Sequence, residues 1–407
     1  MRILIIVDVY PPEISSAGHL MQELAEGLSE KGNEITVVTS YPRHYLDSDG
    51  REKILKASLH EKGVRVIRIK TLPLRKVNFI IRGISQLILP LLFLRKIEQT
   101  IKGDLDAVIV YSPPLPLGLI GKRIKNDYGA KFILNVQDIF PQNAIDLGIL
   151  KNKLLIKFFE IIEKNVYKNA DVITFNSEGG RKFLIEKKRI PSEKIITLHN
   201  WIDPAPYQDV TKNLYFRKRY KIEGKFIFVF AGVMGPAQGL DFLVKVAKEV
   251  SENKNIVFLL IGDGMEKEKI KKMIADLSLK NVIVENFISK EDYPCLLKEV
   301  DVGVVCLSAK NRTAFIPGKF LGYLAAGLPV VAFLNKESDG FTIINESKCG
   351  YASESEDLNR AKEIINRIYS EKNILKHMGN SGYNYLLKKF TLDATIKKFE
   401  ELFKKNI

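Results

Sequence analysis

The strongest constraint on the fold of this chain is a repeated alternation of short apolar runs with longer amphipathic stretches. In the first half, helix-like segments separate the runs RILIIVDV, EITVVTS, AVIVYS and KFILNVQD. The second half restarts the same rhythm with FIFVFAG, NIVFLLIG, NVIVENF, VGVVCLS and LPVVAF. Apolar runs spaced by helices are typical of parallel sheets that helices cover on both faces. We therefore predict an α/β protein with two successive doubly wound, Rossmann-like domains.

The boundary between these domains is predicted near LHNWIDPAPYQ, at 198–208, which is rich in Pro and Asn and follows the last apolar run of the first half. We assign residues 1–200 to the first domain and 201–389 to the second. A final helix at 390–407 is expected to pack back on the first domain. Ligands bind at the carboxyl ends of strands in such folds, so the two domains are expected to face each other across a cleft.

Composition narrows the choice of partners. The chain has 407 residues and a formal net charge of +15, which is typical of proteins that meet nucleic acid, anionic membranes or phosphorylated ligands. Biased codon usage toward lysine explains the charge equally well. No nucleic-acid-binding signature accompanies the lysines, so nucleic acid is not expected as a partner. Cys295, Cys306 and Cys349 lack metal-ligand spacing and are predicted to be buried thiols in a reducing cytoplasm.

Two basic, amphipathic segments bear on membrane contact. The segment at 72–96 has its longest uncharged run at 83–94, well short of the ~20 residues that a spanning helix needs. Basic residues flank its apolar ones, as in helices that lie in a membrane interface. The segment at 151–168 has the same character. Peripheral membrane attachment is one interpretation, and ordinary surface helices with solvated lysines are the other.

Two loops of the first domain carry candidate polar groups. PPEISSAGHL, at 11–20, places Ser16 where it can cap a helix and Gly18 where it leaves room for a ligand. VQDIFPQNA, at 136–144, places Gln137 and Asp138 at the carboxyl end of a strand. An acid in that position is a candidate for general-base work or for binding a sugar hydroxyl. The alternative is an aspartate that only caps the next turn.

Two segments of the second domain are candidates for anion binding. In FAGVMGPAQGLDFL, at 230–243, a glycine-rich turn precedes a helix and can approach a pyrophosphate or simply form a turn. In AFIPGKFLGYLAAGLPVVAF, at 314–333, Lys319 opens a short helix after Pro-Gly, which suits a docked anion or an ordinary α/β unit. IGDGMEKEKI has only part of a dinucleotide fingerprint and predicts a tight turn. LDSDG, at 46–50, is interpreted as a polar turn, and no metal is expected.

In their order along the chain, PPEISSAG, HNWID, FAGVMGPAQGLD and IPGKFLGYLAAGLPVV resemble the retaining GT-B glycosyltransferases of family 4. The resemblance extends over nearly the whole chain. HNWID, MGPAQGLD and QDIFPQNAIDLGIL are similar to one branch, which contains N-acetyl-L-fucosamine transferases of O-antigen or capsule assembly. The resemblance implies that the first domain holds an acceptor and the second a nucleotide-sugar.

The resemblance also implies individual roles. Lys319 would balance the charge of the leaving nucleotide, and Asp138 would position the acceptor or the sugar. Ser16 and Gln137 are the implied acceptor-binding residues. The implied donor-binding residues are Gly18, Gly235, Gln238, Phe287, Ile288, Arg312, Pro317, Gly318 and Gly322.

Several positions depart from the family pattern. Two glutamates that many members carry eight residues apart fall on Ala314 and Gly322 here. An arginine and a lysine of the glycine-rich turn are replaced, the lysine by Gln238, and a common histidine falls near Gln137. The usual contacts to the ribose and the transferred sugar therefore do not carry over. Arg312 and Lys319 are predicted to neutralise the phosphates instead.

We therefore expect a metal-independent, retaining transferase. It would move an amino-deoxy sugar, N-acetyl-L-fucosamine, from a UDP-sugar to a polyprenyl-diphosphate-linked saccharide. It would act in the cytoplasm, at the inner face of the cell membrane. Two alternatives on the same fold stay open: a nucleotide-sugar 2-epimerase and a non-catalytic partner subunit.

Overall fold

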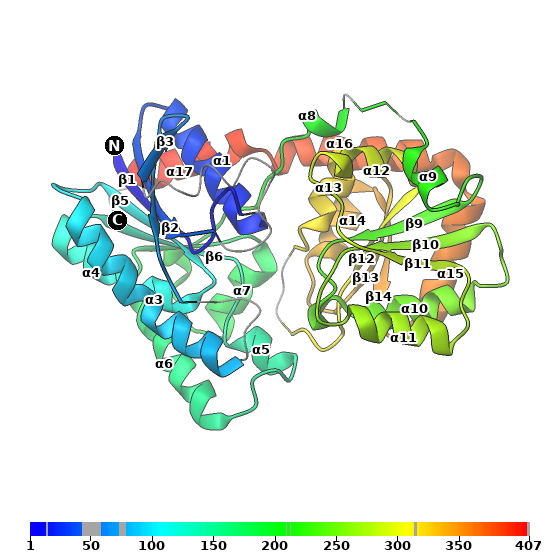
Figure 1. The fold of residues 1–407 in the computed structure, drawn as a ribbon, viewed down its shortest axis with the longest axis horizontal. Helices are drawn as coiled ribbons and strands as arrows, with labels where there is room; N and C mark the ends of the chain where they lie inside the picture. Colours follow the sequence, from blue (N-terminus) through cyan, green and yellow to red (C-terminus); the bar gives the residue numbers. More distant parts are fainter. Residues whose placement is uncertain are drawn as a thin grey trace. The chain divides into compact units, whose positions relative to one another are not determined.

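The computed structural model describes residues 1–13, 15–42, 58–72, 79–208, 210–211, 213–312 and 316–404. The chain divides into two compact units (Figure 1). The first consists of Met1–Asn200 with Leu392–Ile407, and the second of Trp201–Thr391. Each unit contains a largely parallel sheet with helices on both faces, which confirms the predicted fold class. The LDSDG segment and Ala314 lie outside the described residues.

The sheet of the first unit has the strand order β3-β4-β2-β1-β5-β6-β7-β8. All neighbouring strands are parallel except β3 and β4. The central strand pairs on both sides, with Ile3 opposite Ile35 and Ala107. The strand order reverses beside this strand, and ligands of doubly wound folds bind at such a point. The strands are β1 (Arg2–Ile6), β2 (Glu34–Ser40), β3 (Ser58–Glu61), β4 (Val64–Ile69), β5 (Ala107–Ser112), β6 (Lys131–Val136), β7 (Val172–Phe175) and β8 (Ile195–Thr197).

Helices cover both faces of this sheet. They are α1 (Ser16–Glu30), α3 (Phe79–Thr100), α4 (Gly118–Tyr128), α5 (Gln142–Asp146), α6 (Lys153–Asn169), α7 (Glu178–Glu186) and α17 (Leu392–Lys404), with 3-10 turns η1 (Leu115–Leu117) and η2 (Ser192–Lys194). Figure 1 shows α1 and α17 on one face and α3, α4 and α6 on the other. The last helix packs closely on the first, because a β-carbon added to Gly27 would lie 2.4 Å from Ile396 Cδ1.

Helix α3 contains most of the segment that the sequence marked for membrane contact. Leu89, Phe93 and Ile97 are fully buried in the core of the first unit. On the same helix, Ile84 and Leu91 are exposed. In the described part of the chain, no helix is long and apolar enough to cross a membrane.

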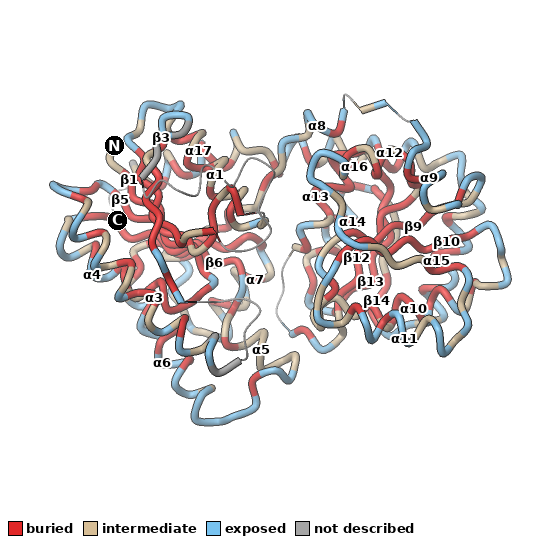
Figure 2. Tube along the Cα trace, in the orientation of Figure 1, coloured by how far each residue is buried: buried red, intermediate tan, exposed pale blue. Residues whose placement is uncertain are grey.

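The sheet of the second unit has the order β11-β10-β9-β12-β13-β14, and all its neighbouring strands are parallel. The inner strands are buried on both faces (Figure 2), as continuous apolar runs predict. Phe228 lies opposite Phe258 in the register, and their rings stack at 5.2 Å. The strands are β9 (Phe226–Ala231), β10 (Ile256–Ile261), β11 (Val282–Glu285), β12 (Val302–Cys306), β13 (Val330–Leu334) and β14 (Gly350–Glu354).

The second unit has helices α8 (Ala205–Gln208), α9 (Tyr215–Arg219), α10 (Leu240–Glu249), α11 (Lys267–Asp276), α12 (Asp292–Glu299), α13 (Lys319–Ala325), α14 (Gly340–Ser347), α15 (Leu358–Ser370) and α16 (Leu375–Lys389), with 3-10 turns η3 (Pro236–Gln238) and η4 (Lys372–Ile374). Helices α12, α13, α14 and α16 pack on one face of the sheet. Helices α10, α11 and α15 pack on the other (Figure 1).

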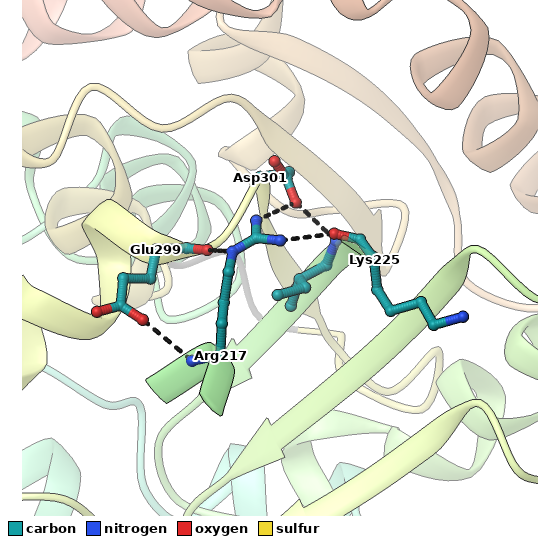
Figure 3. Close-up of polar contacts among 5 residues, drawn as sticks. Arg217, Lys225, Glu299 and Asp301 are labelled. Carbon is teal, nitrogen blue, oxygen red and sulfur yellow. Dashed lines mark hydrogen bonds and ion pairs between the residues drawn. The ribbon is translucent and has the colours of Figure 1, made fainter. Parts of the chain in front are cut away.

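A buried polar network fastens α9 to the sheet of the second unit (Figure 3). The carboxylate of Glu299 accepts hydrogen bonds from the backbone N–H groups of Tyr215, Phe216 and Arg217. The Arg217 guanidinium donates to Asp301 at 2.8 Å. Asp301 also accepts from the N–H of Ile227, in β9, at 2.8 Å. This network belongs to the scaffold, because its acids and its guanidinium are occupied by the fold itself.

Candidate functional site

Two glycine-rich turns meet at the carboxyl edge of the second sheet, after the neighbouring strands β9 and β10. The Gly232 N–H donates to Ile261 O at 2.8 Å. The Met234 N–H donates to Asp263 O, also at 2.8 Å. A β-carbon added to Gly262 would lie only 1.8 Å from the carbonyl oxygen of Gly232. The first glycine of IGDG therefore lets the backbones of the two turns touch.

Lys319 places a charged group at this carboxyl edge of the second sheet. Its Nζ donates to Gln238 Oε1 at 2.6 Å and lies 4.6 Å from the centroid of the Phe230 ring. Gly232 makes room for the side chain, because a β-carbon there would lie 2.8 Å from Lys319 Cε. Desolvation by the surrounding protein lowers the pKa of Lys319 from 10.5 to about 8. The structure thus holds an ammonium group where α13 meets the glycine-rich turn.

The start of α13 is less open to an anion than the sequence suggests. The N–H of Phe320 already donates to Pro317 O at 3.0 Å, and that of Leu321 to Gly318 O at 3.2 Å. Pro317 is buried, whereas Gly318 is exposed. The helix has only seven residues. The side chain of Lys319 is therefore a stronger candidate for binding an anion than the backbone of the helix.

Other predicted donor-binding residues divide into two groups. Gly235, next to η3, and Phe287, after β11, both follow strands at the same edge, and the Phe287 side chain is 46% exposed. Ile288 is half-buried beside it. Gly322, in contrast, is buried in α13, where an added β-carbon would lie 3.0 Å from the Tyr293 hydroxyl oxygen. Gly322, where many family members carry a glutamate, thus packs against Tyr293 and leaves no space for a longer side chain.

Arg312, predicted to share the neutralisation of phosphates, is exposed. Its Nη1 lies 3.7 Å from Glu337 Oε1, so part of its charge is already balanced. A basic group that the sequence analysis missed is Lys267, which is buried and donates to Asn286 Oδ1. Within the run EKEKIKK this lysine looks like one solvated charge among several, so no local signal marks it.

In the first unit, Gln137 lies at the carboxyl end of β6 and is buried. Its Nε2 donates to Asn135 Oδ1 at 2.5 Å. Its Oε1 accepts from Asn176 Nδ2 at 3.0 Å and from Asn200 Nδ2 at 2.7 Å. Both ends of this amide are therefore engaged within the protein. Gln137 ties three loops together at the edge where an acceptor is predicted.

Asp138 follows Gln137 and lines an apolar cavity of about 430 Å³. Asp138 is exposed to solvent at the wall of the cavity. The protein around it still removes part of the water from its carboxyl group, and this desolvation raises its pKa above the usual 3.8. Burial, and to a lesser extent the charge of Asp138, raises the pKa of the Tyr111 phenol. The arrangement suits a carboxyl group that orients a hydroxyl group of a ligand.

The start of α1 corrects one prediction. The helix is capped by Ser15, not by Ser16, because Ser15 Oγ accepts from the N–H of Gly18 at 2.9 Å. Ser16 is the first helical residue. Gly18 is buried, and an added β-carbon would lie 3.3 Å from Tyr10 Cα, so the helix packs closely on the loop after β1. Among the described residues, no group of three or more His, Cys, Asp and Glu side chains is arranged to hold a metal ion.

Comparison with known proteins agrees with this architecture. The family profile "Glycosyl transferase 4-like domain" matches residues 17–201, and "Glycosyl transferases group 1" matches 212–385. The "Probable glycosyltransferase WbjE" of Pseudomonas aeruginosa is 24% identical over 334 residues, which cover 80% of each chain. WcaI of Escherichia coli K12, whose name assigns it to colanic acid biosynthesis, is 24% identical over 340 residues, which cover 80% of this chain and 82% of WcaI.

A solved structure shows the same fold. HepE of Anabaena, crystallised in complex with UDP, superposes with a TM-score of 0.72 and 14% identity. The superposition covers 99% of both chains.

Proposed function

The chain is a glycosyltransferase of the GT-B fold, and we propose that it transfers a sugar from a UDP-sugar to a lipid-linked saccharide. Its glycosyl transferase 4-like domain is followed by a glycosyl transferases group 1 domain. The observation that carries the donor part is the bond between Lys319 and Gln238. It places an ammonium group at a strand-end site of the second unit, where doubly wound folds bind ligands. A diphosphate is the part of a nucleotide-sugar that needs this charge.

UDP is the proposed donor nucleotide. The crystal structure of HepE with UDP, on the same fold, supports this choice. Phe287 and Ile288 follow β11 and offer apolar surface for the base. The diphosphate would form an ion pair with the ammonium group of Lys319. Gln238 would then lose its hydrogen bond to that group or share the group with the diphosphate.

The proposed reaction retains the configuration at the anomeric carbon. The bond between that carbon and the UDP oxygen breaks, and a bond to the acceptor oxygen forms on the same face. The acceptor's proton passes to the departing diphosphate oxygen, so UDP leaves and no protein base is required. Lys319 would stabilise the negative charge that develops on the diphosphate. Asp138 would orient the acceptor hydroxyl.

The proposed sugar is an amino-deoxy sugar, N-acetyl-L-fucosamine, and the proposed acceptor is a polyprenyl-diphosphate-linked saccharide of O-antigen or capsule assembly. The motifs HNWID and MGPAQGLD support the sugar. The relative named for colanic acid biosynthesis supports a polysaccharide product. Exposed apolar side chains next to lysines on α6 support work at the inner face of the cell membrane.

Thermal unfolding with a panel of UDP, GDP, dTDP and ADP tests this proposal. A ligand that binds only the folded state raises its stability by mass action. We expect UDP to raise the melting temperature of the wild type and of Lys336→Ala, an exposed lysine variant that serves as the control. Lys319→Ala should lose the response.

Each other outcome has a clear meaning. No response to any nucleotide would favour the non-catalytic partner subunit. An unchanged response in Lys319→Ala would overturn the phosphate role of that lysine. A UDP-sugar that exchanges its C2 hydrogen with solvent, without transfer, would point to the 2-epimerase.

A further inference from the structure

The cavity beside Asp138 lies wholly within the first unit and has an unusual lining. Its volume of about 430 Å³ falls within the range of small-molecule sites, about 300–1,000 Å³. Helices α3, α5 and α6 and the turn η1 contribute its walls, mainly with aliphatic and aromatic side chains. Among the described residues that line it, Asp138 is the only charged one. A polar sugar does not match such walls, whereas a hydrocarbon chain does.

The lining of the cavity combines two kinds of residue. Pro113, after β5, and Asp138, after β6, come from the carboxyl edge of the sheet. Ile84, Leu155 and Phe158 are helical side chains that are also exposed to solvent, at 51%, 42% and 42%. The cavity is therefore lined both by residues that follow strands and by apolar side chains of the surface.

The exposed apolar surface continues beyond the residues that line the cavity. Leu91 lies about one helical turn from the cavity-lining Leu87, and Ile161 lies about one turn from Phe158, so these residues share helix faces. Leu91 is 68% exposed, Leu154 79% and Ile161 60%. Exposed apolar side chains that adjoin one another mark a surface that binds a partner or a membrane. We call the exposed apolar residues Ile84, Leu87, Leu91, Leu154, Leu155, Phe158 and Ile161 the apolar rim.

The charge beside the apolar rim indicates an anionic membrane surface. Lys151, Lys153 and Lys157 are exposed at the start of α6, interleaved with rim residues, and Glu160 is the acid that follows them. In the described part of the chain, these three lysines have no ion pair with an acidic side chain. Basic side chains that flank apolar ones match the anionic headgroups and acyl region of a membrane interface.

From the cavity and the apolar rim together, we propose that the cavity holds the isoprenoid chain of the lipid-linked acceptor. The chain enters from the membrane over the rim and fills the cavity. Its head-group end emerges at the carboxyl edge of the first sheet, where Asp138 would take a hydroxyl group of the saccharide. This inference rests on the proposed function, because the chain in the cavity would belong to the acceptor proposed there. The cavity lining includes Asp138, which is proposed to orient the acceptor, so the acceptor's own chain fits the cavity better than the tail of a bulk phospholipid.

Binding of short isoprenoid diphosphates to the full chain tests the proposal without a transfer assay. We would compare farnesyl diphosphate, dimethylallyl diphosphate and inorganic diphosphate by isothermal titration calorimetry. The wild type is expected to bind the farnesyl compound at least tenfold more tightly than the other two. Equal affinity for all three would overturn the proposal, because the hydrocarbon would then add nothing.

Gly83→Leu is the variant that fills the cavity. Gly83 lines it, and a β-carbon added there meets no atom within 4 Å, so a leucine side chain has space. Leucine also favours a helix more than glycine does, so folding should not suffer. We expect Gly83→Leu to weaken farnesyl diphosphate binding at least tenfold, and Gly83→Ala to change it less than twofold. Unchanged binding in Gly83→Leu would place the chain elsewhere and overturn the proposal.

Two further comparisons separate the possible failures. Micelles of short-chain phosphatidylglycerol that displace farnesyl diphosphate at equal chain concentration would assign the cavity to bulk lipid and overturn the proposal. Stabilisation by UDP, measured on the same samples, reports on the proposed function independently. A UDP response with no farnesyl binding would overturn the cavity assignment alone. Farnesyl binding with no UDP response would overturn the donor assignment and leave the cavity assignment supported.

Discussion

Lys319 Nζ and Gln238 Oε1 lie 2.6 Å apart although 81 positions separate the two residues in the sequence. The contact joins α13 to η3, the two segments that the sequence marks separately as candidates for anion binding. Since an ammonium group has three donors, Lys319 can keep one bond to Gln238 and offer others to a phosphate. Gln238 is thus a neutral partner that positions the charge of Lys319.

The low pKa of Lys319 predicts that UDP binding weakens as the pH rises above about 8. Only the protonated lysine attracts the diphosphate, so binding above this pH must be accompanied by proton uptake. We expect the dissociation constant to rise by up to tenfold for each pH unit above 8. Calorimetry in buffers of different ionisation enthalpy measures the uptake directly.

Lys319→Arg provides the control, because arginine stays charged throughout this range. Its UDP affinity should be flat between pH 7 and pH 9.5, whatever its absolute value. If the wild type showed no proton uptake at pH 8.5, Lys319 would not be the group that meets the diphosphate.

Gly232→Ala should weaken UDP binding at least tenfold and also lower stability. Gly232 has φ of +143°, which an alanine adopts only with strain of about 1–3 kcal/mol. Its β-carbon would lie 2.8 Å from Lys319 Cε and would displace the side chain from Gln238. Melting temperature and UDP titration measure the two effects separately.

Gly235→Ala is the matched control for folding. Gly235 has φ of −116°, and an added β-carbon would meet Val233 Cγ1 only at 3.8 Å. Its melting temperature should stay close to that of the wild type. Equal destabilisation by the two alanines would show that the backbone conformation of Gly232 has no special role.

The interior strands could be predicted from the sequence because their apolar runs are long and continuous. Strands β9 and β10 are buried at every residue, so their sequences reflect burial directly. Strand β14, GYASE, is an edge strand whose residues are mostly half-buried, and no apolar run marks it. It forms through pairing with β13, which is a tertiary effect.

The candidate site was also only partly predictable, because it too depends on tertiary contacts. Asp138, which follows a strand, and Lys319, which begins a helix, can be located from the alternation of elements and from the family resemblance. The exchange of Ser16 for Ser15 as the cap shows that boundaries shift by one residue. The cavity could not be predicted, since it is enclosed by helices α3, α5 and α6, whose separate sequences show only amphipathic patterns.

Asp138→Asn should retain most transfer activity and gain stability at neutral pH. An orienting role survives in asparagine, so we expect a loss of less than tenfold in kcat. A general base contributes about 10²–10⁴-fold, so a loss above a hundredfold would contradict the orienting role. Initial rates with saturating UDP-sugar distinguish the two.

The stability part follows from the sign of the pKa shift. The folded protein holds the Asp138 proton to a higher pH than the unfolded chain does. Stability is therefore lost as the pH rises from 3.8 toward the higher pKa that Asp138 has in the folded protein. The melting temperature of Asp138→Asn should exceed that of the wild type at pH 7, and the difference should shrink toward pH 4. A lower melting temperature at pH 7 would contradict this account.

Glu299→Ala should destabilise the second unit strongly and leave its ligand site intact. The Glu299 carboxylate is buried and accepts three backbone N–H bonds at the start of α9 (Figure 3). Hydrogen bonds to a charged group contribute about 1.5–3 kcal/mol each and are not additive, so we expect a total loss of roughly 3–5 kcal/mol. Urea unfolding measures it. Arg360→Ala, which removes an exposed pair with Glu363, is the control and should cost less than about 1 kcal/mol. Below the melting temperature of Glu299→Ala, its UDP affinity should match the wild type, because the network holds the scaffold and touches none of the residues around Lys319.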